Sequence, residues 1–150
     1  MSDDKAVSLY KGVVQPWECD SLGHLTTRFY VAMFDDASYQ LLFEIFGWSG
    51  ASDAAQQRAF VDVRHEIDYL DEIQAGELIE IRGTLVQVGT KSIRARYDMR
   101  KRGAEGIVAS LEATYVLFDL NERVALALDE ALSAQARAAL SNEEDGSTRH

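Results

Sequence analysis

Residues 20–47 read DSLGHLTTRFYVAMFDDASYQLLFEIFG, and this stretch decides how the rest of the chain is interpreted. A short turn leads into a long segment that is apolar on nearly every side. Its polar residues form only a thin strip: Arg28, Asp35, Asp36, Gln40 and Glu44. This pattern predicts a helix that is buried on most sides. Thr26 or Thr27 is suited to cap its start, and Gly47 to end it. We expect the remaining elements to wrap this helix.

A single carboxylate, Asp20, lies just ahead of the predicted helix. The N-terminus of a helix is positively polarised and presents free backbone N–H groups, so it favours negative charge. A reactive group beside it is well placed for chemistry that develops an oxyanion. A purely structural role for Asp20, as the residue that closes or caps the turn, is the alternative.

Length and composition limit the class of protein. A chain of 150 residues has room for one full core, and we predict one domain over residues 1–140 with a disordered tail over 141–150. No apolar run approaches the ~20 residues that span a bilayer, and the acidic N-terminus lacks the apolar core of a signal peptide. We therefore expect a cytoplasmic protein without membrane contact. The single cysteine, Cys19, excludes an intrachain disulfide and a cysteine-based zinc cluster.

The net charge of −10 argues against broad electrostatic binding of nucleic acid or anionic membranes. A phosphate-bearing ligand would need a local cluster of cations. The richest such cluster is Lys91, Arg94, Arg96, Arg100, Lys101 and Arg102.

The rest of the chain reads mainly as strands. Residues 6–15 are rich in β-branched side chains, and 49–58 read as a loop or a short helical turn. Residues 60–70 alternate, which places Val61, Val63, His65, Ile67 and Tyr69 on one face. Three further strands are predicted over 78–88, 91–100 and 105–120, and a last helix, capped by Asp129, over 130–140. One helix followed by four strands in an antiparallel meander predicts an α+β protein, with a sheet curled around the helix.

The motif resembles a known family. Asp20-Ser21-Leu22-Gly23-His24, followed by Tyr30, Phe34 and Ala37, is similar to the D-x-x-G-H signature of hotdog-fold acyl-CoA thioesterases of the 4-hydroxybenzoyl-CoA thioesterase type. Later segments, such as Ile67-Asp68-Tyr69-Leu70 and Val88-Gly89-Thr90-Lys91-Ser92, look like those of the same family. The resemblance implies a curved antiparallel sheet of five strands wrapped around one helix, with a C-terminal helix added, and a homodimer or homotetramer. Many relatives carry Asn after the His, where this chain has Thr26 and Thr27.

The resemblance also implies site residues. Asp20 would be the nucleophile or general base, with His24 beside it, and backbone N–H groups from about Gly23 to Thr27 would stabilise the oxyanion. Further candidates for substrate binding are Tyr30, Trp17 and His65, although core packing is the commoner role for such side chains. Lys91, Ser92 and Arg94 would bind CoA, and their alternative is a solvated strand face. Neither a metal nor a cofactor is implied, because CoA is part of the substrate.

Three functions remain open at this stage. The first is hydrolysis of an acyl-CoA to a carboxylic acid and free CoA. The second is hydrolysis of an acyl-carrier-protein thioester, which the acidic composition disfavours because carrier proteins are acidic themselves. The third is a non-catalytic acyl-CoA-binding module. The sequence does not select the acyl group, the oligomeric state, or between the two roles of Asp20.

Overall fold

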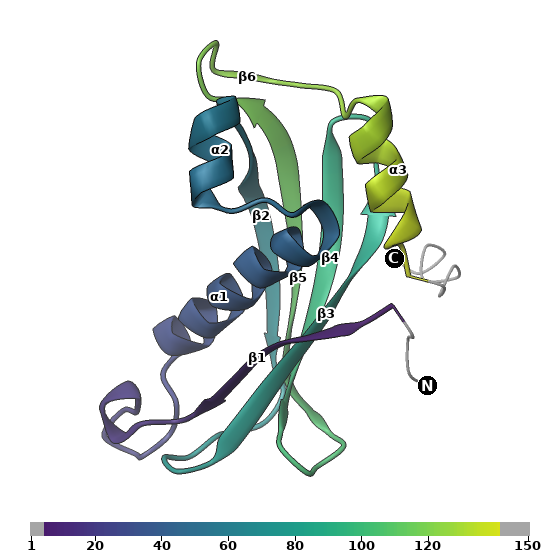
Figure 1. The fold of residues 1–150 in the computed structure, drawn as a ribbon. Coiled ribbons are helices and arrows are strands. Elements are labelled where there is room, and N and C mark those ends of the chain that lie inside the picture. Colours follow the sequence, from purple (N-terminus) through teal and green to yellow (C-terminus); the bar gives the residue numbers. More distant parts are fainter. Residues whose placement is uncertain (1–4, 142–150) are drawn as a thin grey trace.

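The computed structural model describes residues 5–141 and has one curved antiparallel sheet with a long helix lying across it (Figure 1). This arrangement confirms the α+β class. The elements in chain order are β1 (Val7–Val13), the 3-10 turn η1 (Pro16–Glu18), α1 (Thr27–Phe46), α2 (Gly50–Gln56), β2 (Arg58–Tyr69), β3 (Leu78–Val88), β4 (Ser92–Lys101), β5 (Ile107–Asp119), β6 (Val124–Ala125) and α3 (Glu130–Ala138). Of the tail predicted over 141–150, residues 142–150 lie outside the described residues.

The order of the strands differs from the predicted meander. The sheet runs β1-β3-β4-β5-β2, with the short β6 paired to the end of β5. The strand β2 therefore pairs with β5, from Arg58 opposite Asp119 to Tyr69 opposite Ala109, and not with its neighbour in sequence. Local patterns predict that strands exist, but they carry no information about which distant strand is the partner. Since β1 occupies the edge of β3, β2 becomes the outermost strand on the far side.

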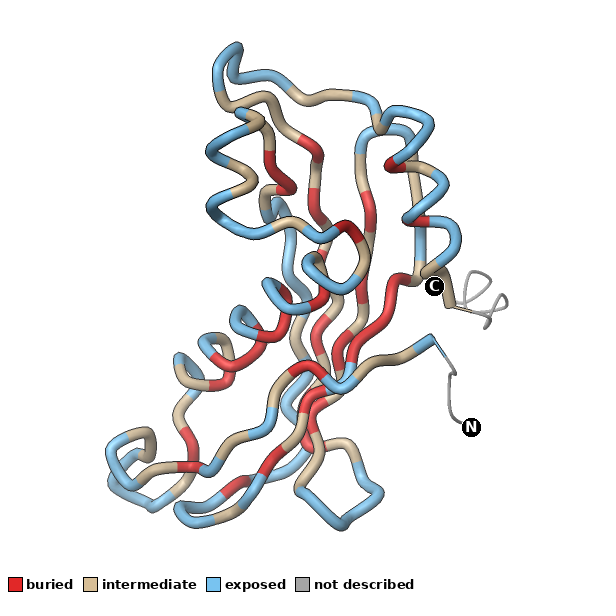
Figure 2. Tube along the Cα trace, viewed as in Figure 1, coloured by how far each residue is buried: buried red, intermediate tan, exposed pale blue. Residues whose placement is uncertain are grey.

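Helix α1 buries one face only, which corrects the prediction of a helix buried on most sides. Its buried residues recur at helical spacing against the sheet: Tyr30, Met33, Phe34, Ala37, Ser38, Leu41 and Phe46. On the opposite face Tyr39 is 60% exposed and Phe43 is 55% exposed. The alternation of buried and exposed positions along α1 is visible in Figure 2. The sheet of one chain covers only one side of the helix, so an apolar strip remains in contact with solvent.

A β-bulge divides β2 and corrects the face predicted for it. The pairing register with β5 shifts between Asp62 and Arg64. Before the bulge Phe60 is buried, whereas Val63 within the bulge is 56% exposed. The extra residue reverses which side chains face each side of the sheet, because the alternation of side chains does not continue unbroken through a bulge. Asp62 and His65 consequently point to the same side of the strand and form an ion pair.

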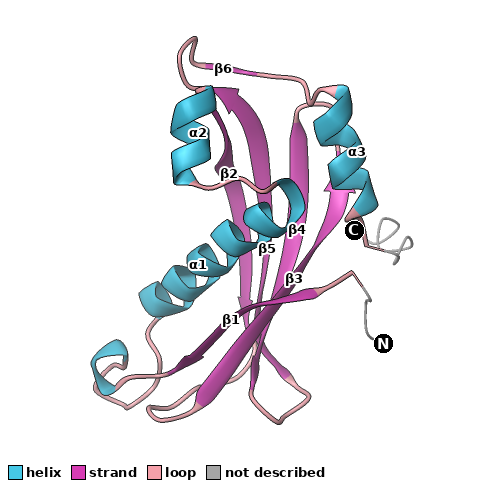
Figure 3. Ribbon diagram, viewed as in Figure 1, coloured by secondary structure: helices cyan, strands magenta, loops and turns pink. Residues whose placement is uncertain are grey.

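The ends of the helices follow the sequence signals closely. Gly47 ends α1 in the left-handed conformation, with φ 72°, as a C-terminal glycine does. The side chain of Asp129 caps α3 by accepting a hydrogen bond from the backbone N–H of Leu132 at 2.8 Å. The segment predicted as a loop or short helical turn contains α2, and Figure 3 shows α2 and α3 as separate short helices beside the sheet. Within residues 5–141, no helix has the length and apolarity needed to cross a membrane.

Candidate active site

The turn before α1 holds Asp20 in a fixed orientation. Its backbone carbonyl accepts a hydrogen bond from the N–H of Gly23 at 2.9 Å, and its backbone N–H donates to the carbonyl of His24 at 2.9 Å. One side-chain oxygen, Oδ1, accepts hydrogen bonds from the backbone N–H groups of Leu22 and His24, at 2.9 and 3.1 Å. Gly23 has φ 86°, a conformation that a residue with a Cβ adopts only with strain. The Asp-x-x-Gly-His motif is therefore a structural unit.

The same contacts set the charge state of Asp20. The backbone N–H of His24 is the largest influence that lowers the pKa of the Asp20 carboxyl, helped by the N–H groups of Leu22 and Gly23 and by the His24 side chain. Hydrogen bonds to the charged form favour that form. Asp20 is exposed to solvent and remains a carboxylate throughout the physiological pH range.

Most of the backbone N–H groups proposed as oxyanion donors already have acceptors. Those of Gly23 and His24 bond to Asp20, that of Leu25 donates to the carbonyl of Ile73 at 2.8 Å, and that of Thr26 donates to Glu18 at 3.0 Å. Thr27 is the remaining member of the predicted range and opens α1. The first N–H groups of a helix have no acceptor within the helix. The predicted oxyanion site therefore narrows to the N–H of Thr27 and the first turn of α1.

His24 contacts a carboxylate that no local sequence pattern indicates. Its Nε2 lies 3.2 Å from Oε1 of Glu72, in the loop between β2 and β3. The two segments are held together by an isolated bridge between His24 and Gln74 and by the hydrogen bond from Leu25 to Ile73. Residues 24 and 72 are far apart in sequence, and only the pairing of the two loops reveals the contact.

The two aromatic residues predicted for substrate binding have different environments. Tyr30 is 5% exposed, its ring meets that of Tyr69 edge-on at 5.1 Å, and its hydroxyl donates to the carbonyl of Asp71 at 3.4 Å. Burial is the main cause that raises the pKa of the Tyr30 hydroxyl. Trp17 lies on η1 and is 73% exposed. Tyr30 thus packs behind the Asp20 turn, whereas Trp17 presents its ring to the outside.

His65 belongs to a second polar cluster, formed by Asp35, Asp62 and His65. Its Nε2 lies 3.3 Å from Oδ2 of Asp62. Burial raises the pKa of Asp35 on α1, and the negative charges of Asp62 and Asp36 raise it further, while His65 lowers it. Asp35 is eight residues beyond Thr27, which places it about 12 Å along the helix axis at ~1.5 Å per residue. This cluster is therefore separate from the contacts of Asp20.

Two tyrosines form a hydrogen bond in the core near this cluster. The hydroxyl oxygens of Tyr97 on β4 and Tyr115 on β5 lie 2.6 Å apart, and both side chains are almost fully buried. Burial raises the pKa of each hydroxyl well above its ordinary value. Both therefore stay neutral, and each provides the other with a partner in a region closed to water.

The predicted CoA-binding residues lie away from Asp20. Lys91 is in the turn between β3 and β4, and Ser92 begins β4 opposite Val116. The carbonyl of Thr90 in the same turn accepts a hydrogen bond from the N–H of Leu128. Figure 1 shows this turn beside the start of α3, at the end of the sheet opposite the Asp20 turn. On β4, Arg94 faces Glu112, with Nε 3.7 Å from Oε1. A single chain does not bring these residues to Asp20.

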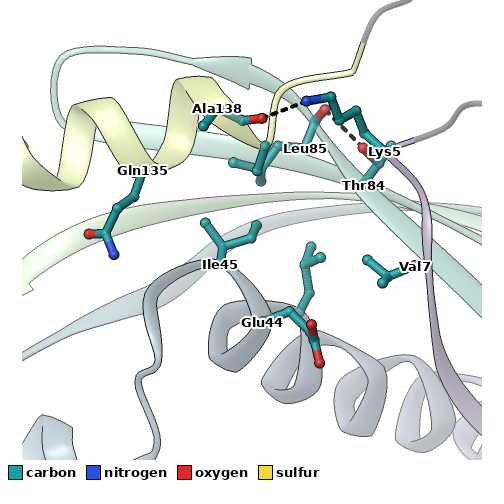
Figure 4. Close-up of a pocket in the computed structure, with 10 residues that line it drawn as sticks. Lys5, Val7, Glu44, Ile45, Thr84, Leu85, Gln135 and Ala138 are labelled. Carbon is teal, nitrogen blue, oxygen red and sulfur yellow. Dashed lines mark hydrogen bonds between the residues drawn. The ribbon is translucent and has the colours of Figure 1, made fainter.

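A cavity of about 280 Å³ lies near the other end of α1, and Figure 4 shows its lining. Val7, Leu41, Ile45 and Leu85 supply apolar walls, and Nζ of Lys5 donates to the carbonyl of Ala138 at 2.9 Å. Ile45 is 18 residues beyond Thr27, or about 27 Å along the axis at ~1.5 Å per residue. This cavity is too far from Asp20 to hold the acyl group of a thioester at that carboxylate.

The next feature is the arrangement of possible metal ligands in the part of the chain that the structure describes. No group of three or more His, Cys, Asp or Glu side chains there is arranged to hold a metal ion.

A sequence profile of the thioesterase-like superfamily matches residues 14–136, most of the chain and the whole of the Asp20 turn. The chain belongs to the thioesterase-like superfamily. It is a thioester hydrolase by this membership, as the sequence predicted. No curated protein matches the sequence significantly.

Solved structures show that this thioesterase has the hotdog fold expected from the sequence. A 1,4-dihydroxy-2-naphthoyl-CoA thioesterase from Synechocystis, Slr0204, superposes with a TM-score of 0.76 at 16% identity, over 88% of this chain and 96% of that chain. SAV2348 from Staphylococcus aureus, solved in complex with CoA, gives 0.79 at 14% identity over 89% and 86%. The gentisyl-CoA thioesterase BH1999 gives 0.71 at 17% identity over 82% and 97%. At such identities the likeness establishes the fold of the thioesterase and leaves its substrate open.

Proposed function

We propose that this thioesterase hydrolyses an acyl-CoA to a carboxylic acid and free CoA, with Asp20 as the catalytic carboxylate. The observation that carries the proposal is the geometry of the Asp20 turn. Oδ1 is held by two backbone N–H groups, and the side chain is exposed to solvent in the turn that leads into α1. A carboxylate that is oriented, ionised and accessible suits a nucleophile or a general base in thioester hydrolysis.

The first turn of α1 supplies the electrostatic part of the mechanism. The thioester carbonyl would be bound with its oxygen toward the N–H of Thr27, where the helix end favours developing negative charge. The half-exposed ring of Tyr69, supported edge-on by the buried Tyr30, is a candidate surface for the acyl group. Trp17 and His65 remain candidates for contacts farther along the acyl group. The reaction requires no cofactor, since CoA enters as part of the substrate.

Two copies of the chain would complete the CoA site. Lys91, Ser92 and Arg94 lie at the end of the sheet opposite Asp20. Within the described residues β2 pairs only with β5, so its other edge is open along 12 residues. A second copy paired antiparallel along this edge is turned end for end. Its turn between β3 and β4 then approaches the Asp20 end of the first copy, which supports a homodimer with composite sites.

The test is release of free thiol from acyl-CoAs with short, medium, long, aromatic and charged acyl groups. Asp20→Asn is expected to lower turnover by at least about 100-fold, as loss of a catalytic group does, with the fold retained by circular dichroism. Glu122→Gln is the control, because Glu122 is an exposed carboxylate in the turn between β5 and β6 and its removal should leave turnover within about twofold. Near-normal turnover of Asp20→Asn would refute the assignment. Hydrolysis only of acyl-carrier-protein thioesters would move the substrate to the protein-bound class.

A further inference from the structure

The cavity beside the C-terminal half of α1 has a lining that the chemistry at Asp20 does not use. Its floor is formed by the buried side chains of Leu41 and Leu85. Its walls include the half-buried side chains of Val7 and Ile45. Protein interiors are normally packed with few voids larger than a water molecule. A cavity of ~150 Å³ already holds benzene, so this cavity of about 280 Å³ has room for a larger organic molecule.

The rim of this cavity carries two charges of opposite sign. Lys5, ahead of β1, donates a hydrogen bond of 2.9 Å from Nζ to the backbone carbonyl of Ala138. Ala138 is the last residue of α3, and the carbonyl end of a helix favours a positive charge nearby. Glu44 carries the negative charge on α1, and its side chain is exposed. Figure 4 shows the two charged groups at opposite edges of the cavity.

The two charges and the apolar floor define the chemistry of a molecule that fits. A carboxylate would meet the ammonium group of Lys5, an ammonium group would meet the carboxylate of Glu44, and an apolar chain would lie over the floor between them. Hydrogen bonds between ionised groups are stronger than those between neutral groups. A molecule with one charge would gain one attractive contact and would face a group of its own sign at the other edge.

The same two charges disfavour CoA and its acyl esters as occupants. CoA carries several phosphate charges, whereas Lys5 is the one cation among the described residues that line this cavity. The carboxylate of Glu44 would repel the phosphates. The cavity is also distant from the Asp20 turn, since Ile45 lies about 27 Å beyond Thr27 along the axis of α1 at ~1.5 Å per residue. A ligand held here is therefore separate from the thioester substrate.

We propose that this cavity is a second ligand site of the protein, which binds a linear ω-amino carboxylic acid with its carboxylate at Lys5 and its ammonium group at Glu44. A chain of six carbons suits the volume, because the six carbons of benzene occupy a cavity of ~150 Å³ and the two charged ends take up part of the remainder. The alternative is a structural rim, in which Lys5 only caps α3 and Glu44 is only solvated. Such a rim would give no preference for a molecule with both charges.

The test is calorimetric titration of the full chain with three probes: 6-aminohexanoate, hexanoate and hexylamine. We expect 6-aminohexanoate to bind at least about 10-fold more tightly than either of the others, because each of those lacks one charge-assisted hydrogen bond. Methyl spectra of protein labelled at isoleucine then locate the ligand. The methyl resonance of Ile45, which lines the cavity, should shift with 6-aminohexanoate, and that of Ile67 on β2 should not.

Substitutions assign the two charged contacts. Glu44→Gln should bind 6-aminohexanoate and hexanoate within about twofold of each other, since the ammonium group loses its partner charge. Lys5→Met should in the same way bind 6-aminohexanoate and hexylamine equally. Ile45→Phe enlarges a wall of the cavity and should weaken all three probes. Glu122→Gln and Lys11→Met are the controls, because they remove exposed charges outside the lining and should bind as the native protein does.

Preferential binding of 6-aminohexanoate that is lost in both Glu44→Gln and Lys5→Met supports the second site. Equal binding of the three probes, binding of none, or tighter binding of hexanoate than of 6-aminohexanoate overturns it. Should Ile45→Phe fail to fold, the two charge variants still decide, because both of their side chains are exposed. Each of these outcomes leaves the thioesterase assignment untouched, since thiol release by the native protein and by Asp20→Asn tests that assignment separately.

Discussion

At the scale of single residues, the structural role of Asp20 in its turn is compatible with the catalytic role that we propose for it. One oxygen, Oδ1, closes the turn by accepting two backbone hydrogen bonds, and the side chain is exposed to solvent. The structural role would therefore support the proposed chemical one, because it orients the carboxyl group and favours its ionised form. The buried tyrosine pair in the core shows the opposite case, in which polar groups are closed off from water and bond to each other.

Removing both hydroxyls of the tyrosine pair should lower the free energy of unfolding by less than the sum of the two single removals. Tyr97→Phe leaves the buried hydroxyl of Tyr115 without its partner at 2.6 Å, which is expected to lower the free energy of unfolding by about 1–3 kcal/mol. The double variant with Tyr115→Phe should lose less than the sum of the two single variants. Urea unfolding measures all three, and Tyr39→Phe is the exposed control, expected within ~0.5 kcal/mol of the native protein. Simple additivity would show that the two hydroxyls do not depend on each other.

The site could be predicted only where its residues are close in sequence. Asp20, Gly23 and His24 form one contiguous motif, so a reading of the chain groups them without knowledge of the fold. Glu72 lies beside His24 because the turn before α1 pairs with the loop between β2 and β3, and no local sequence signal predicts that pairing. The partnership of Asp62 with His65 was hidden by the bulge, which inverted the face assigned to half of β2.

At the scale of elements, the ends of helices were the most predictable feature, since they depend on neighbouring residues alone. Gly47 ends α1 as predicted, and Thr26 occupies the N-cap position, although its side chain makes no capping hydrogen bond. The strand order does not match the prediction, because the edge of β3 is taken by a strand from the beginning of the chain. The burial of α1 was overestimated for a related reason. Its apolar residues occur on most sides of the helix, whereas the sheet of one chain covers only one side.

At the end of α1, a substitution can test the cost of a backbone conformation without changing side-chain packing. Gly47 has φ 72°, and a Cβ added there meets nothing within 4 Å, so Gly47→Ala has only the left-handed backbone to strain. We expect a loss of about 1–2 kcal/mol in the free energy of unfolding. Gly50→Ala is the control three residues on, where space is equally open but φ is not positive, and it should be neutral or stabilising by about 0.4–1 kcal/mol. Equal effects of both changes in a thermal melt would contradict the role assigned to Gly47.

At the scale of the whole molecule, three features of the described chain are consistent with the second copy that we propose. The apolar strip on α1 includes exposed Tyr39 and Phe43, the outer edge of β2 has no strand beside it, and the cations predicted for CoA lie at the end away from Asp20. A long open strand edge is a template for pairing with another chain. Antiparallel pairing of β2 with its copy would cover the edge and turn each cationic end toward the other copy's Asp20. In this pairing, Arg58 of each copy would also lie toward Asp68 of the other copy.

A charge placed in the middle of the β2 edge should therefore separate the copies and lower activity together. Val63 is 56% exposed within the bulge, so Val63→Lys should leave the fold of each chain intact while two ammonium groups approach each other across the interface. We expect light scattering after size exclusion to show about half the native mass, with turnover at least about 10-fold lower because each site loses the residues of its partner. Val124→Lys, on β6 and 49% exposed, is the matched control and should keep both mass and turnover. A Val63→Lys variant with native mass would place the interface elsewhere. One with half the mass and full turnover would show that each chain carries a complete site, and that Lys91, Ser92 and Arg94 do not serve the Asp20 of a second copy.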